Sequence, residues 1–193
     1  MDSTTWPLAR AAWADCDDAA LVRTVRTDPD AFGELCVRYS GRLYSYLRVR
    51  TQSDEDAADL TQQVFVKAFN ALPRYRERGL PFGAWLFRIA RNLLTDVQRR
   101  RKDTVSWNVL PEALQPVMPG EVDAGLLQQE LNTRLHLLVQ ELPSDKRDLI
   151  LLRFVAGLTL REISAVVGKS ESTIHKQLKR ILAVLQEQYH DDE

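Results

Sequence analysis

Apolar residues recur at the three- or four-residue interval of an α-helix along most of this 193-residue chain. The clearest case is the segment FGAWLFRIARNLLTDVQRRRK, residues 82–102. At 100° per residue its apolar side chains share one side of a helix: Leu86, Ile89, Ala90, Leu93 and Val97. Alternating apolar runs bounded by turn dipeptides, which indicate β-hairpins, are nearly absent. The sequence therefore predicts an all-α fold.

Helix start and stop signals divide the chain into segments. Ser53 and the acids after it suit a helix N-terminus, and Pro73 ends the same helix after Leu72. Between Asp103 and about residue 125 the helical pattern is interrupted by prolines and Gly120. We therefore expect two small helical domains joined by a flexible acidic linker, with these ranges: an N-terminal extension at 1–27, a first domain at 28–102, the linker at 103–127 and a second domain at 128–193.

Charge is strongly segregated, although the net charge is only −1. Residues 74–102 contain nine basic and two acidic residues, whereas residues 103–130 contain five acids and no Lys or Arg. In the segment 82–102, basic and amide side chains occupy the side of the helix opposite the apolar one. A solvated basic face is one interpretation, and a surface that binds an anion is the other.

The segment TLREISAVVGKSESTIHKQLKRILAVL, residues 159–185, has the layout of a helix-turn-helix. Thr159 and Ser170 can each cap a helix, and Gly168 supplies the turn between them. The second helix presents polar and basic side chains opposite its apolar face. A plain helical hairpin is the alternative, but the turn glycine, the two caps and the basic outer face together favour DNA binding.

Other classes of site find little support in the sequence. Cys16 and Cys36 lack a CxxC pattern or a nearby paired histidine, so we expect free thiols and no metal site. The three histidines are scattered, and a metalloprotease motif or Gly-rich phosphate loop is missing, so we expect neither an enzyme nor a cofactor. A signal peptide or membrane span is not evident, and we expect a cytoplasmic protein that does not bind a membrane.

Three stretches in this order resemble the extracytoplasmic-function sigma factors of bacterial RNA polymerase. They are DAADLTQQVFVKAFNAL, FGAWLFRIARNLLTDVQRRR and LPSDKRDLILLRFVAGLTLREISAVVGKSESTIHKQLKRI, and the similarity covers roughly residues 28–102 and 130–186. The resemblance implies an alternative sigma factor that binds the clamp and flap of core RNA polymerase and directs initiation at specific promoters. It also implies regulation by an anti-sigma factor.

By the same resemblance, the first domain binds the melted minus-ten element and the second binds the minus-thirty-five element as duplex. Aromatic and cationic side chains suit flipped, single-stranded bases, and the expected single-strand contacts are Tyr75, Arg76, Phe82, Trp85, Arg88, Arg91, Asn92, Thr95, Arg99 and Lys102. Trp85 can equally be a core residue. The expected duplex contacts are Lys169, Ser172, Thr173, Lys176, Gln177, Lys179 and Arg180.

The helix expected at residues 54–72 is apolar over most of its circumference, which indicates a partner beyond its own domain. The resemblance implies polymerase contacts there, and we assign them to Asp59, Gln62, Gln63, Phe65 and Phe69. Phe65 and Phe69 can instead belong to the core.

Two rival functions remain open. A helix-turn-helix regulator that acts without entering the polymerase predicts tight duplex binding by the free chain. An enzyme acting on nucleic acid predicts metal-dependent activity.

Overall fold

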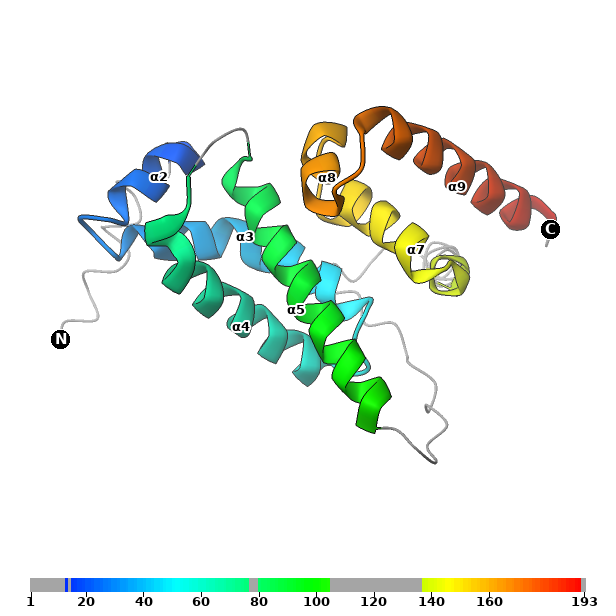
Figure 1. The fold of residues 1–193 in the computed structure, drawn as a ribbon, viewed down its shortest axis with the longest axis horizontal. Helices are drawn as coiled ribbons and strands as arrows, with labels where there is room; N and C mark the ends of the chain where they lie inside the picture. Colours follow the sequence, from blue (N-terminus) through cyan, green and yellow to red (C-terminus); the bar gives the residue numbers. More distant parts are fainter. Residues whose placement is uncertain (1–12, 14, 77–79, 105–136, 192–193) are drawn as a thin grey trace, which may run out of the picture.

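The computed structural model describes residues 13, 15–76, 80–104 and 137–191, and every regular element among them is helical (Figure 1). The all-α prediction is confirmed. The helices form two groups, one from each half of the sequence. Most of the predicted linker lies outside the described residues, so its acidic segment stays a sequence-based prediction.

In the described part of the chain, the first group includes α2 (Asp18–Thr24), α3 (Ala31–Arg48), α4 (Asp54–Ala71) and α5 (Phe82–Thr104). The Ser53 side chain caps α4 by accepting a hydrogen bond from the Asp56 amide at 3.0 Å. A short 3₁₀ turn, Leu72–Arg74, follows α4 and contains Pro73, the residue predicted to end the helix.

Helix α2 lies within the range that the sequence set apart as an N-terminal extension. Leu21 is completely buried, and Asp18 forms an ion pair of 3.1 Å with Arg38 on α3. The Tyr39 hydroxyl also donates a hydrogen bond to Asp18. This burial favours placing α2 in the first domain, although the domain limits remain predictions.

The core of the first domain lies between α3, α4 and α5. The apolar side of α5 faces inward as its spacing predicted, with Leu86 and Ala90 fully buried. Phe87 and Leu94 are buried beside them, and the Tyr46 ring of α3 meets Phe87 edge-on at 5.5 Å between ring centroids. Because this side of α5 faces the core, Arg88, Asn92, Thr95 and Arg99 are left exposed.

The second group contains α7 (Ser144–Ile150), a π-helical turn (Leu151–Val155), α8 (Leu160–Val167) and α9 (Glu171–Asp191). Thr159 and Glu162 form a capping box at the start of α8, and Gly168 ends it in the left-handed conformation with φ 72°. Ser170 then accepts a hydrogen bond from the Thr173 amide at 3.3 Å. The predicted helix-turn-helix and both of its caps are confirmed.

The two groups of helices pack against each other. Helix α8 contacts α5 as well as α9, and the π-helical turn contacts α3. Within the described part of the chain, no helix is long and apolar enough to cross a membrane.

Candidate nucleic-acid interface

Helix α5 presents the polar face that its sequence predicted. Arg88, Asn92, Thr95 and Arg99 are all exposed. The Thr95 hydroxyl donates to the Arg91 carbonyl at 2.8 Å, so this side chain is turned back onto its own helix. The side chain of Lys102 lies outside the described residues. The described part of this face therefore offers the guanidinium groups of Arg88 and Arg99 and the amide of Asn92 to a ligand.

The aromatic residues before and at the start of α5 form a cluster. The Tyr75 and Trp85 rings lie 4.6 Å apart at 40°, and Phe82 lies 5.7 Å from Trp85 between ring centroids. Phe82 and Tyr75 are buried, and the Tyr75 hydroxyl donates to the Leu80 carbonyl at 2.6 Å. Trp85 is only half-buried. The first two rings thus pack against Trp85, which is the most exposed aromatic side chain of this cluster.

A cationic side chain flanks this cluster. Arg76 is exposed in the described part of the loop before α5. A guanidinium at this position can follow the phosphates on either side of a stacked base.

The outer face of the helix-turn-helix carries the predicted duplex-binding residues. Six are exposed: Lys169, Ser172, Thr173, Lys176, Lys179 and Arg180. Gln177 is half-buried and accepts a hydrogen bond from the Lys169 Nζ at 3.5 Å. Ile174 and Leu178, on the opposite side of α9, are buried. Because its apolar side packs on the rest of the domain, α9 can enter a major groove with its basic side facing the DNA.

The predicted polymerase contacts fall into two sets on α4. Asp59, Gln62 and Gln63 are exposed and line an open groove together with Val66. Phe69 is 43% exposed, although its ring packs against Phe32 at 5.1 Å between centroids.

Phe65 differs from these residues because it is half-buried and packs against the core. Its ring meets Phe32 edge-on at 6.3 Å between centroids. Phe65 therefore contributes to the core, and Val66, which the sequence did not single out, is the more accessible apolar residue.

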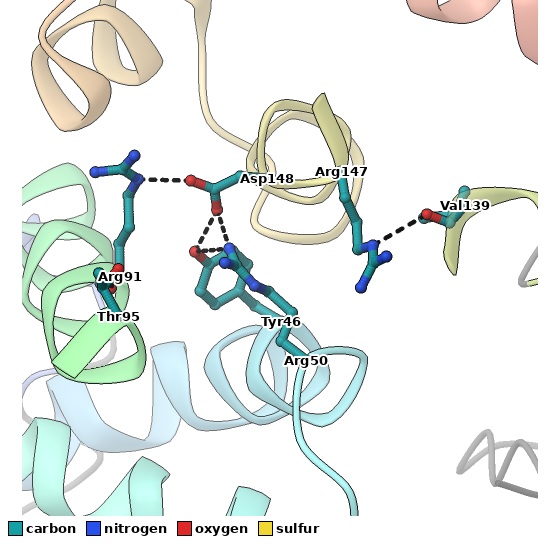
Figure 2. Close-up of polar contacts among 7 residues, drawn as sticks. All are labelled: Tyr46, Arg50, Arg91, Thr95, Val139, Arg147 and Asp148. Carbon is teal, nitrogen blue, oxygen red and sulfur yellow. Dashed lines mark hydrogen bonds and ion pairs between the residues drawn. The ribbon is translucent and has the colours of Figure 1, made fainter. Parts of the chain in front are cut away.

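One predicted residue is engaged between the two domains. Arg91 donates from Nε to Asp148 of α7 at 2.6 Å (Figure 2). The Tyr46 hydroxyl donates to the same carboxylate at 2.6 Å, and Arg50 forms an ion pair with it. Burial, and then the charge of Asp148, raise the pKa of Tyr46, so its hydroxyl stays protonated as a donor.

Tyr46, Arg50 and Asp148 were not found from the sequence. Tyr46 and Asp148 are separated by 102 positions, and no short motif joins them. The only local sign is an acid placed directly before the apolar run that begins at Leu149. Such a pattern does not identify the partner of the acid.

Comparison with known protein families identifies both domains. A family model of Sigma-70 region 2 matches residues 35–104, and one of Sigma-70 region 4 matches residues 132–185. A chain with these two regions is a sigma factor. This chain belongs to the ECF RNA polymerase sigma factors.

Two curated relatives are similar over most of the chain. The ECF RNA polymerase sigma factor BldN of Streptomyces coelicolor is 31% identical over 93% of this chain and 69% of the relative. The ECF RNA polymerase sigma factor SigD of Mycobacterium tuberculosis is 32% identical over 85% of this chain and 81% of the relative.

Two solved structures share the fold. CnrH in complex with the cytosolic domain of CnrY is 25% identical and superimposes with a TM-score of 0.68 over 91% of this chain and 99% of that chain. RpoE from Bartonella quintana, in complex with the anti-sigma factor NepR, is 23% identical with a TM-score of 0.65. The match covers 84% of this chain and 98% of that chain.

Proposed function

We propose that this chain directs core RNA polymerase to specific promoters, reading the minus-thirty-five element as duplex and the minus-ten element as melted single strand. The observation that carries the proposal is a pair of exposed basic helix faces, on α5 and on α9, in a chain of the ECF sigma family. In this proposal the protein has no enzymatic activity of its own and acts in the cytoplasm with the polymerase.

The two faces suit different forms of DNA. On α9, Lys176 and its neighbours can contact phosphates and base edges in a major groove. On α5, Asn92 can address a base edge only after the strands separate, and Trp85 can stack on an unpaired base. The exposed side of α4 is the surface that we assign to the polymerase clamp.

An anti-sigma factor is a further proposed partner. The support is that two solved relatives of the same fold are complexes, CnrH with the cytosolic domain of CnrY and RpoE with the anti-sigma factor NepR.

Promoter binding requires the packed domains to separate. Helix α8 contacts both α5 and α9, so the axes of α5 and α9 lie within about 20–24 Å, two helix diameters, where they flank α8. The two promoter elements lie about 25 base pairs apart, which corresponds to roughly 85 Å of duplex at about 3.4 Å per base pair. The packed chain is too short to reach both elements at once.

The test compares Lys176→Ala with Asn92→Ala in run-off transcription with core polymerase. Both side chains are exposed, so both variants should fold normally. Losing one base contact costs about 1–3 kcal/mol, so each should reduce transcription roughly five- to 150-fold. Permanganate reactivity of thymines in the minus-ten element measures strand opening.

A pre-melted template separates the two roles. We expect it to rescue Asn92→Ala at least partly and to leave Lys176→Ala unrescued, because only the first residue acts on opened strands. Equal rescue of both variants, or of neither, would contradict the division of labour. Tight sequence-specific duplex binding by the chain without polymerase would favour the ordinary regulator.

A further inference from the structure

The contact between the domains is centred on one carboxylate that is held by three donors. Asp148 comes from α7, and its side chain is 4% exposed. The donors Tyr46, Arg50 and Arg91 all come from the first domain and converge on the two carboxylate oxygens (Figure 2). The first domain therefore carries an anion site, and its occupant is a side chain of the second domain.

The chemistry of this site suits a phosphate as well as a carboxylate. Guanidinium groups bind both anions through the same arrangement of N–H donors, and a tyrosine hydroxyl can donate to either. Arg91 lies on α5 between the exposed Arg88 and Asn92. Arg91 thus joins the anion site to the surface that we assign to the melted strand, and Tyr46 of α3 lies on the other side of the Asp148 carboxylate (Figure 2).

We propose that Tyr46, Arg50 and Arg91 form a binding site for a backbone phosphate of promoter DNA, and that Asp148 occupies this site in the free chain as an intramolecular competitor. The inference rests on the proposed function and adds to it one phosphate contact with the DNA and an intramolecular competitor for that contact. When the domains separate on a promoter, Asp148 leaves and the DNA takes its place.

Cationic side chains are concentrated around Asp148. Arg50 and Arg91 both form ion pairs with it, so two guanidinium groups face one carboxylate. The neighbouring Arg147 points away and donates from Nε to the Val139 carbonyl at 3.2 Å (Figure 2). Burial, followed by the charge of Arg50, lowers the pKa of Arg147. Two acids of α4, Asp56 and Asp59, line a cleft beside Arg50. A DNA strand that replaced Asp148 would place a negatively charged phosphate beside Arg50 and Arg91, so these two side chains would still have an anionic partner.

The energetics permit the exchange. A buried ion pair contributes little net stability, because the cost of desolvating both charges offsets most of their attraction. The other polar contacts between the domains include Arg42 donating to the Ala156 carbonyl at 3.1 Å and Gln140 donating to the Val49 carbonyl at 2.8 Å. If one chain in about ten is open, the closed form lowers the apparent affinity for DNA about tenfold.

The experiment measures binding of a labelled single-stranded oligonucleotide of mixed sequence to the full chain by fluorescence anisotropy at several salt concentrations. Asp148→Asn should bind up to about tenfold more tightly than wild type. The slope of log affinity against log salt should stay the same, because the same phosphate contact forms in the bound complex of both chains. Adding Arg50→Gln should remove the gain in affinity and make the slope shallower by about 0.7, the value for one lost phosphate contact on a single strand. Asp145→Asn is the matched control, because it removes the same charge from an exposed position on α7 and should change neither quantity.

Three results would overturn the inference. An equal gain from Asp145→Asn would mean that net charge alone acts, and no gain from a folded Asp148→Asn would mean that the carboxylate is only structural. Arg50→Gln alone also opens the contact but lacks a phosphate ligand, so tighter binding by this variant would also contradict the proposal. That third comparison decides the matter even if Asp148→Asn fails to fold. Failure of wild type to support transcription with core polymerase would reject the sigma function and leave these binding contrasts unchanged.

Discussion

Val66→Ala is the most direct test of the α4 surface as a polymerase contact. Val66 is 60% exposed, the largest exposed fraction among the large apolar side chains of the described residues. An exposed valine contributes little to the core, and alanine is the better helix former. The substitution should therefore leave the melting temperature of the free chain unchanged or slightly raised.

The expected loss of polymerase binding follows from the exposed area. Burying a whole valine side chain contributes about 1.5–3 kcal/mol. If the polymerase covers the 60% that is exposed, its share is roughly 1–2 kcal/mol. This free energy corresponds to a roughly five- to thirtyfold weaker complex with core polymerase.

The assay is a titration of labelled chain with core polymerase, accompanied by circular dichroism melting. Val184→Ala is the matched control, because Val184 is 44% exposed on α9, away from α4. An unchanged dissociation constant for Val66→Ala, or an equal loss for Val184→Ala, would refute the assignment. Phe65→Ala is a poorer probe, since its half-buried ring packs on Phe32 and its loss also destabilises the fold.

Three further predictions concern stability and reactivity. Gly83→Ala should destabilise the chain by about 1–3 kcal/mol in thermal melts, because a Cβ there would lie 2.7 Å from the Tyr39 hydroxyl oxygen, whereas Gly41→Ala, with open space around it, should not. Gly168→Ala should lower the free energy of unfolding, measured in urea, by about 1 kcal/mol, since the φ of 72° is unfavourable for alanine. An unchanged free energy would contradict this expected strain. Burial raises the pKa of the Cys36 thiol from 9.0 to about 11, so alkylation at pH 9 should be slower in the folded chain than in urea. The stabilisation linked to this thiol should be complete below pH 9 and decline as the pH rises toward 11.

The sequence alone predicted the features that depend on nearby residues. Helical spacing placed the buried and polar sides of α5, because both follow from the angle between successive residues. Thr159, Gly168 and Ser170 predicted the helix-turn-helix, because caps and left-handed turns are interactions within a few positions. Segregated charge predicted the exposed basic residues, because an unpaired charge stays in water.

Only the tertiary structure decided the features that join distant segments. It brought Tyr46, Arg50 and Arg91 to the carboxylate of Asp148, and it packed α2 against α3. The physical reason is that burying a charge requires a partner at hydrogen-bonding distance, but that partner can come from anywhere in the chain. Local spacing specifies which side of a helix faces inward. The packing of whole domains decides which charged side chains meet between them.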